Sequence, residues 1–267
     1  LLKEFEISKD VQIKIVNYAN EKNITIFSAP SHMNDLEIMK KMELPIFKIG
    51  SDLACHTPLL KEIGNLNKPI ILSTGMCSLD EVRSSVNTIL STGNNQLAIL
   101  HCVSNYPALP EESNLNVINL LKKEFNLPVG LSDHCIGSTI AIGAAAIGAN
   151  IIEKHFKNIH NSPSPDDIVA LNKEEFSSLI KAIRLLDKAK GNGKKIPTDS
   201  EKINLKTNRV SIISSIEIHK GEIISKGMLD IKRPGIGIQP IDFEDIIGRK
   251  AKINISKDIP LTFDMLE

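Results

Sequence analysis

The chain has 267 residues, of which 42% are hydrophobic, and 32 Lys and Arg residues balance 32 Asp and Glu residues. This composition is typical of a globular protein with a full-sized core, and the zero net charge argues against attraction to nucleic acid or to an anionic membrane. No apolar run reaches the roughly 18 residues that a bilayer-spanning helix needs, and the first residues lack a signal-peptide pattern. We therefore expect a cytoplasmic protein, with no nucleic-acid or membrane partner.

Two further features concern the ends and the thiols of the chain. The first residue is Leu1 rather than Met, from which we expect a fragment of a longer chain. The cysteines have neither CxxC spacing nor the density of a disulfide framework, so we expect reduced thiols at all four positions: Cys55, Cys77, Cys102 and Cys135.

Short apolar runs alternate with segments of helical period along the first 190 residues. The runs predict six strands, at 24–28, 46–51, 69–74, 97–102, 128–133 and 150–156. Between them and after them, the periodicity predicts helices at 10–21, 33–43, 56–64, 78–91, 114–124, 138–148 and 172–189. This alternation predicts an α/β fold built from βα units around a parallel sheet.

Nearly all of the predicted strands are apolar on both faces, which favours a TIM-type barrel over residues 1–190, with helices outside and side chains filling the interior. The alternative is an open doubly wound sheet. That fold usually carries a glycine-rich phosphate loop after an early strand, and the sequence contains neither GxGxxG nor GxxxxGK[ST].

A change of texture follows the last predicted helix. The stretch 188–197 is rich in Gly, Lys and Pro, which predicts a linker over 191–207 and a small β-rich domain over 208–267. One pattern recurs in that domain, because 218–229 and 255–266 both begin Ile-x-Lys and both end Met-Leu. We expect two similar turns there.

Polar pairs end the last two predicted strands of the barrel: Ser132 with His134, and Glu153 with His155. Residues two apart on a strand face the same way, and parallel barrels carry their active sites at the carboxyl ends of the strands. The two imidazoles are therefore predicted to share one metal ion, in a catalytic site with open positions. The alternative is that each histidine satisfies a backbone group at a strand end.

Other polar residues stand at the same level of the earlier strands: Lys48, Ser51, Ser73, Thr74, Ser104 and Tyr106. A lysine beside a glycine turn, with several hydroxyls converging on it, favours a cradle for a phosphate or a carboxylate. The alternative is that the Ser and Thr residues only form turns. His101 is predicted to be a histidine at the edge of the core.

Six segments together resemble the sialic acid synthase family, in order and in approximate spacing. They are Lys48-Ile-Gly-Ser51, Pro69-Ile-Ile-Leu-Ser-Thr-Gly-Met76, Leu100-His-Cys-Val-Ser-Asn-Tyr-Pro107, Gly130-Leu-Ser-Asp-His134, Ile152-Glu-Lys-His-Phe156 and Lys232-Arg-Pro-Gly-Ile-Gly-Ile238. The resemblance covers essentially the whole chain, and its last part is similar to the antifreeze-like (SAF) domain that follows the barrel in that family.

The resemblance implies a fold and a reaction. The family's barrel has eight strands, so the first two βα units would be absent from this chain, and the fragment alone would be inactive. Its members condense phosphoenolpyruvate with the open-chain aldehyde of an N-acylmannosamine-type sugar, giving a nine-carbon 2-keto acid and phosphate. The product is most simply N-acetylneuraminate or legionaminate. The alternatives are pseudaminate, another metal-dependent aldolase-like barrel that uses phosphoenolpyruvate, and an inactive truncated scaffold.

The resemblance also implies roles for individual residues. His134 and His155 would bind a divalent ion, typically Mn²⁺ with Mg²⁺ or Co²⁺ as substitutes, and Glu153 would position the sugar or the attacking water. The implied phosphoenolpyruvate ligands are Lys48, Ser51, Ser73, Ser104 and Ser132, and the implied sugar ligands are Tyr106 and Asp166. Arg233 would reach the site of the other subunit in a domain-swapped homodimer.

Overall fold

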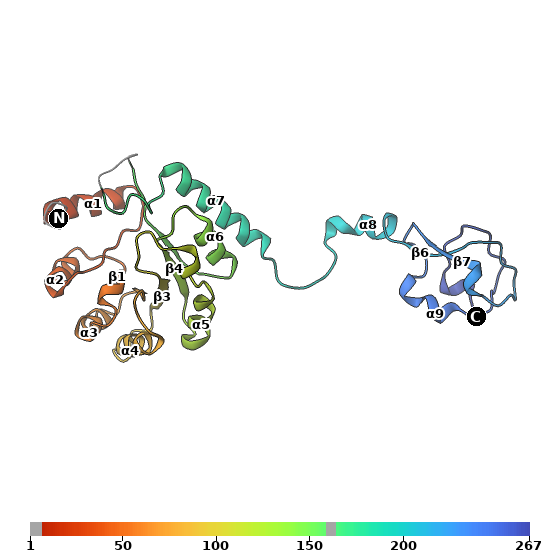
Figure 1. Cartoon of the computed structure of the whole chain (residues 1–267), viewed down its shortest axis with the longest axis horizontal. Helices are drawn as coiled ribbons and strands as arrows, with labels where there is room; N and C mark the ends of the chain where they lie inside the picture. The colour runs from red at the N-terminus through yellow and green to blue at the C-terminus, as the bar shows by residue number, and fades with distance from the viewer. Residues whose placement is uncertain (1–6, 159–163) are drawn as a thin grey trace. The chain divides into compact units, whose positions relative to one another are not determined.

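The computed structural model describes residues 7–158 and 164–267. The chain divides into two compact units, Leu1–Asn192 and Gly193–Glu267, and each is described by itself (Figure 1). None of the helices in the described parts of the chain combines the length and the apolar character that crossing a membrane requires.

The larger unit alternates strands and helices. Within the residues described, its strands are β1 (Phe47–Ile49), β2 (Ile70–Ser73), β3 (Leu97–Cys102), β4 (Val129–Asp133) and β5 (Ile152–Lys154). Its helices are α1 (Lys9–Glu21), α2 (Met33–Lys41), α3 (Thr57–Asn65), α4 (Leu79–Leu90), α5 (Asn116–Phe125), α6 (Thr139–Ala146) and α7 (Lys173–Ala189). All seven helices begin and end within two residues of their predicted positions.

The five strands form one parallel sheet in the order β1-β2-β3-β4-β5. Strand order that follows chain order has no reversal point, which a doubly wound sheet must have. The sheet is curled and the helices line its convex side (Figure 1). The described residues therefore form an open half-barrel of the α/β class, and the doubly wound alternative is wrong.

The first predicted strand, at 24–28, is wrong as a strand. Only Ser28 pairs with the sheet, through a single parallel bridge to Phe47 and a hydrogen bond of 3.1 Å from the Lys48 N–H to the Ser28 carbonyl. The apolar run is present, but Ile24 is 63% exposed. A run of β-branched residues forms a strand only where a partner covers its face, and none of the described residues does so here.

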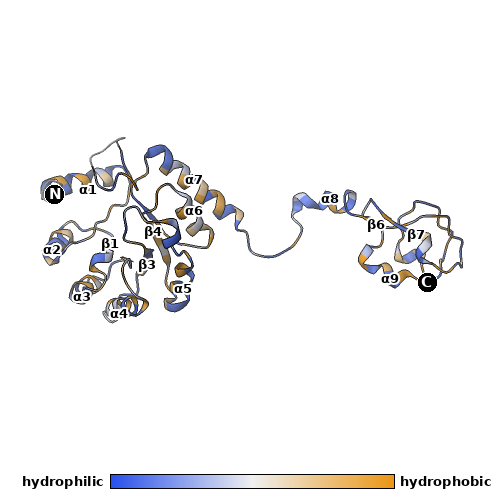
Figure 2. Ribbon diagram, in the orientation of Figure 1, coloured by the Kyte–Doolittle hydropathy of each residue, from blue (hydrophilic) through white to orange (hydrophobic). Residues whose placement is uncertain are grey.

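The main core lies between the sheet and the helices. Alternate strand residues enter it from the convex face, and helix residues meet them there; its central members include Phe47, Ile49, Leu72, Ile99, Val129 and Leu131 from the strands and Leu60, Ile63, Val86 and Ile118 from the helices. Both hydrophilic and hydrophobic colours appear on α3, α4 and α5 (Figure 2), as expected for amphipathic helices that cover a sheet. The intervening strand residues face the concave side.

The smaller unit is β-rich and carries the two predicted similar turns. Its two-stranded sheet pairs β6 (Ser211–Ser214) with β7 (Leu229–Lys232), and its short helices are α8 (Lys202–Thr207) and α9 (Phe243–Ile246). Ile218 and Ile255 exchange two backbone hydrogen bonds, of 2.9 and 2.8 Å. The third residue after each of them has a positive φ, 87° at Gly221 and 59° at Asp258.

The repeated pattern continues past these turns. Each copy ends in a single 3-10 turn at the same offset, Lys226–Met228 and Phe263–Met265. The two copies therefore share both their backbone conformation and their sequence, which confirms the expectation of similar turns. The stretch 191–207, assigned to a linker from the sequence, contains the helix α8 and a 3-10 turn, Asp199–Glu201.

Candidate active site

The site begins where β4 and β5 end. Their register pairs Ser132 with Glu153 and Asp133 with Lys154. Ser132 and Glu153 face the concave side, where the Ser132 hydroxyl donates a hydrogen bond of 2.5 Å to Glu153 Oε1. Residues two apart along a strand face the same side of the sheet. His134 and His155 therefore lie on the concave side, like Ser132 and Glu153. The i, i+2 argument from the sequence is confirmed.

Lys48 reaches this pair from the other edge of the sheet. Its ammonium lies 3.5 Å from Glu153 Oε2 and donates a hydrogen bond of 2.7 Å to Ser73 Oγ. In a flat sheet, β1 and β5 would be separated by four strand spacings, roughly 19 Å, which is far beyond the length of a lysine side chain. The curl of the half-barrel is what brings Lys48 and Glu153 together.

Hydroxyl groups converge beside Lys48, around Gly75. Ser51 Oγ accepts a hydrogen bond of 2.9 Å from the Gly75 N–H. A Cβ added at Gly75 would lie 2.9 Å from Ser51 Oγ, 3.1 Å from Cys102 Sγ, and closer still to Ser104 Oγ. Glycine is needed here because the side chains around it already fill the space. Ser73 and Ser132 are also buried, at 2% and 4% exposure.

The two predicted metal ligands lie side by side. The ring centroids of His134 and His155 are 5.3 Å apart. Tyr106 stacks on His134 at 4.1 Å and meets His155 edge-on at 5.6 Å. The structure therefore brings both imidazoles and the predicted sugar ligand Tyr106 into one cluster.

A hydrogen bond orients the ring of His134, and a longer electrostatic contact lies beside the ring of His155. His134 Nδ1 lies 2.8 Å from the Val103 carbonyl oxygen, and because a carbonyl only accepts, Nδ1 carries the proton. Asp166 Oδ2 lies 3.6 Å from His155 Nδ1, so this predicted sugar ligand also orients a histidine. Both arrangements engage Nδ1 and leave Nε2 as the nitrogen that can bind a metal.

Burial and hydrogen bonds shift the acidity of these groups. Burial opposes protonation of His134, but its hydrogen bonds to Cys102 and to the Val103 carbonyl outweigh burial and raise the pKa. Burial lowers the pKa of His155, against the opposing effect of Asp166. Burial also raises the pKa of Tyr106 to about 12, so its hydroxyl is neutral and can donate.

The donor set fits a catalytic rather than a structural metal site. Across residues 7–158 and 164–267, no cluster of three or more His, Cys, Asp or Glu side chains is arranged to hold a metal ion. Two imidazoles with Nε2 available would leave the other coordination positions to water and substrate, as in an open site.

One predicted site residue, Arg233, lies outside this cluster, and the sequence analysis missed three residues near the site. Arg233 is an exposed residue of the smaller unit, directly after β7. The sequence analysis assigned Cys102 only a structural role. Its thiol is buried, and its Sγ lies 3.8 Å from His134 Nδ1. The sequence analysis also missed the buried ion pair between Asp133 and Lys154. The available signal was charge at strand positions that face the helices, because such charges must be paired.

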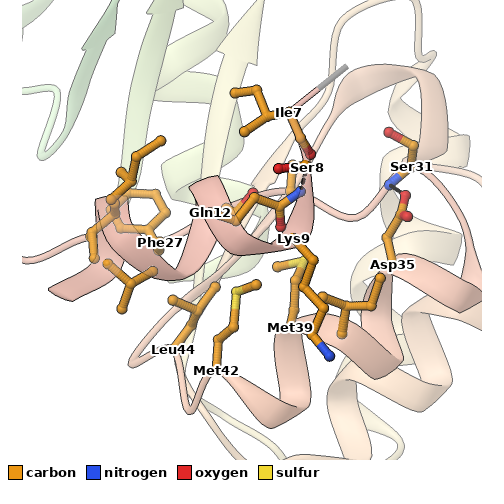
Figure 3. Close-up of a pocket in the computed structure, with 16 residues that line it drawn as sticks. Ile7, Ser8, Lys9, Gln12, Phe27, Ser31, Asp35, Met39, Met42 and Leu44 are labelled. Atoms are coloured by element: carbon orange, nitrogen blue, oxygen red, sulfur yellow. Dashed lines mark hydrogen bonds between the residues drawn. The ribbon is translucent and has the colours of Figure 1, made fainter. Parts of the chain in front are cut away.

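Two of the cavities in the larger unit differ in their relation to the site. One, of about 350 Å³, adjoins the site and is lined by residues that include His155, Lys157, Asp166 and Asp167. The other, of about 570 Å³, lies between α1 and α2 and is lined largely by apolar side chains such as Phe27, Met39 and Met42 (Figure 3). None of the predicted site residues lines the second cavity.

Comparison with known proteins decides the family. The model of the NeuB family matches residues 1–195, and the model of the SAF domain matches residues 209–267. The chain belongs to the NeuB family. The resemblance to sialic acid synthases is therefore confirmed, and so is the antifreeze-like nature of the second domain.

Relatives of this NeuB family member include synthases of several sugar acids. It is 36% identical to the N,N'-diacetyllegionaminic acid synthase of Campylobacter jejuni, over 97% of this chain and 78% of that protein. It is 34% identical to a pseudaminic acid synthase of the same species, over 92% of this chain and 70% of that protein. Identities this similar do not distinguish one product from another.

A solved structure supports the same family. The crystal structure of the N-acetylneuraminic acid synthetase of Leptospira borgpetersenii, in complex with citrate, superposes with a TM-score of 0.73 at 31% identity, covering 77% of this chain and 72% of that one. The NeuB family member described here thus belongs to the nonulosonic acid synthases, whose members include sialic, legionaminic and pseudaminic acid synthases.

Proposed function

We propose that this protein condenses phosphoenolpyruvate with an N-acylmannosamine-type sugar, giving a nine-carbon 2-keto acid and phosphate. The observation that carries the proposal is the single cluster on the concave face, in which Lys48, Ser73, Ser132 and Glu153 lie beside the two imidazoles. A cation and several hydroxyls suit a phosphate and a carboxylate, whereas paired imidazoles suit a divalent ion.

The phosphoenolpyruvate half of the site is assigned to Lys48 and the serines. The Lys48 ammonium can pair with an anionic oxygen of the substrate, and the hydroxyls can donate to others; the serines concerned are Ser51, Ser73, Ser104 and Ser132. These groups hold the enol so that its C3 faces the second substrate. Preorganised donors of this kind require little rearrangement when charge develops.

The sugar half is assigned to Tyr106, Asp166 and the imidazoles. His134 and His155 would hold Mn²⁺, with Mg²⁺ or Co²⁺ as substitutes, and the bound ion supplies Lewis-acid polarisation of the aldehyde oxygen. The neutral hydroxyl of Tyr106 donates to a sugar oxygen, and Asp166 accepts from a sugar hydroxyl. A contribution of Arg233 from the partner subunit of a domain-swapped homodimer is part of the same proposal.

Glu153 is assigned to the water that completes the reaction. The electron pair of the C2–C3 double bond of phosphoenolpyruvate forms the bond from C3 to the aldehyde carbon, and the aldehyde oxygen takes up a proton from solvent to become a hydroxyl. Water then adds at the electron-deficient C2. Glu153 Oε2 is placed to accept a proton from that water, while Ser132 holds Oε1. Phosphate leaves as the C2–O bond breaks, so that one water is consumed for each phosphate released.

The direct test is phosphate release with phosphoenolpyruvate, Mn²⁺ and a panel of N-acylated hexosamines. We expect release with the precursor of N-acetylneuraminate or of legionaminate, and weaker or no release with the pseudaminate precursor. No release with any sugar would contradict the assignment for this chain.

The second candidate is a lysine-dependent aldolase, favoured by the position of the Lys48 ammonium in the centre of the site. An aldolase of that kind would form a Schiff base between Lys48 and pyruvate. Treatment with borohydride in the presence of pyruvate, followed by mass spectrometry, separates the two mechanisms. The synthase proposal predicts no adduct on Lys48.

A further inference from the structure

The strongest unexplained feature is an ion pair on the convex side of the site strands. Lys154 Nζ lies 2.9 Å from Asp133 Oδ2, and the two side chains are 0% and 1% exposed. Neither group faces the concave side, so neither belongs to the cluster described above. Charged side chains this deeply buried are costly to desolvate, and replacing such a pair with apolar residues is often neutral or stabilising. A stability role alone therefore does not explain it.

The ion pair also hydrogen-bonds the backbone next to His134, one of the predicted metal ligands. Asp133 Oδ1 accepts a hydrogen bond of 2.9 Å from the Cys135 N–H. The Lys154 ammonium donates a short hydrogen bond to the Cys135 carbonyl oxygen. The pair thus holds the backbone N–H and C=O of Cys135, which follows His134 in the chain. Asp133 itself directly precedes His134.

The same contacts hold the residue next to the second predicted ligand. Lys154 lies between Glu153 and His155, so its anchoring sets the direction of both neighbouring side chains. Asp133 and Lys154 are opposite each other in the strand register, as are Ser132 and Glu153. A slip of one residue would turn the site side chains to the other face of the sheet. The charged pair favours one register because any slip would leave two buried charges unpaired.

The pair also ends a short chain of buried polar contacts. His101 Nε2 lies 2.8 Å from the Ser113 carbonyl oxygen, and Ser113 Oγ lies 3.2 Å from Cys135 Sγ. The Cys135 backbone then leads to Lys154 and Asp133. Polar contacts therefore hold the strand ends from the convex side of the sheet. Hydrogen bonds and ion pairs depend on direction, whereas apolar packing does not.

We propose that Asp133 and Lys154 are positioning residues, which hold the His134 and His155 imidazoles in the geometry that binds a divalent ion. The proposal rests on the proposed function for the metal itself. Partners behind a metal ligand typically change the affinity for the metal by about 10- to 100-fold when they are removed. We expect a loss of that size, with the fold retained.

The test uses the intact protein and two variants. Lys154→Met removes the cation and leaves Asp133 buried alone, so it should weaken Mn²⁺ binding by at least about tenfold but should also destabilise the protein. Asp133→Val combined with Lys154→Met replaces both charges with apolar side chains. This should restore stability without restoring the hydrogen bonds to the Cys135 backbone. Mn²⁺ dissociation constants come from electron paramagnetic resonance, and stability from urea denaturation followed by circular dichroism.

A matched control separates positioning from general loss of stability. Val86→Ala removes buried volume from α4, far along the chain from the site strands, and is expected to lower stability while leaving Mn²⁺ affinity within about twofold. A double variant that folds stably and binds Mn²⁺ as tightly as the wild type would overturn the proposal. So would an equal loss of affinity in Val86→Ala.

A second readout needs no metal. The Hε1 signals of His134 and His155 in proton NMR depend on the ring currents of Tyr106, whose ring stacks 4.1 Å from His134. We expect the chemical shifts of both signals to change in the double variant and to stay the same in Val86→Ala. If the wild type binds no Mn²⁺, the metal part of the proposed function fails. The NMR signals then decide the positioning role by themselves, and unchanged signals in the double variant overturn it.

Discussion

Ser132 Oγ lies 2.5 Å from Glu153 Oε1, across the register pair that joins β4 to β5, while the other oxygen of Glu153 lies 3.5 Å from the Lys48 ammonium. The carboxylate is therefore held at both oxygens, one by a hydroxyl and one by a cation. A group held in this way is oriented before any substrate arrives, which reduces the cost of reaching the reactive geometry.

The first prediction concerns the charge of Glu153. Glu153→Gln keeps an oxygen for Ser132 but removes the proton acceptor and the partner of Lys48. We expect turnover to fall by about 100-fold or more, because proton transfer by a positioned side chain typically contributes 10²–10⁴-fold. Mn²⁺ affinity should stay within about threefold. Steady-state phosphate release and Mn²⁺ titration measure the two effects, and a large loss of Mn²⁺ affinity would instead make Glu153 a metal ligand.

The second prediction concerns the imidazoles. His134→Ala and His155→Ala should each abolish Mn²⁺-dependent turnover and tight Mn²⁺ binding, because each removes one of the two protein ligands that we propose for the ion. The fold should be nearly intact, since the rings lie at strand ends rather than in the core. His219→Ala, at an exposed position of the smaller unit, is the control and should leave both unchanged. Wild-type Mn²⁺ binding in either site variant would refute the ligand assignment.

The third prediction uses the crowding at Gly75. Gly75→Ala places a methyl group against Ser51 Oγ and Ser104 Oγ, so the two hydroxyls must separate. We expect the dissociation constant for phosphoenolpyruvate to rise by about tenfold or more, equal to about 1.4 kcal/mol. Gly227→Ala is the matched control, because a Cβ there meets nothing within 4 Å. Calorimetric titration with phosphoenolpyruvate gives both constants, and equal affinities in the two variants would remove the serines from the substrate site.

The fourth prediction is a pH dependence of stability due to His101. Burial lowers its pKa in the folded protein, against the hydrogen bond to the Ser113 carbonyl. The unfolded chain then binds the proton more readily, so stability is full above the ordinary histidine pKa of about 6.5 and falls as the pH drops below it. For one proton the slope is at most about 1.4 kcal/mol per pH unit.

His101→Gln should remove this part of the pH dependence. Urea denaturation at pH values between about 5 and 7.5 gives the free energy of unfolding for the wild type and the variant. The difference between them should shrink as the pH falls, because only the wild type loses stability to this proton. His219→Gln, which changes an exposed histidine, should follow the wild type at every pH. A constant difference between the His101 variant and the wild type would contradict the prediction.

Much of the fold could be predicted from the sequence because its signals are local. The capping boxes of α4 and α7, Ser78 with Glu81 and Asn172 with Glu175, define where those helices begin. The predicted strand at 24–28 fails for the opposite reason. Its apolar residues satisfy the local pattern, but a strand forms only where a neighbour supplies the hydrogen bonds, and that is not a local property.

The site divides in the same way. Period-2 alternation along β4 and β5 determined that Ser132, His134, Glu153 and His155 share one face, and six short motifs indicated the sialic acid synthase family. Only the tertiary structure decided that Lys48 meets Glu153, because that contact depends on the curl of the sheet between its two edges. It also revealed that Asp133 and Lys154 are partners, since the pairing of buried charges depends on strand register, which is set across strands rather than along one.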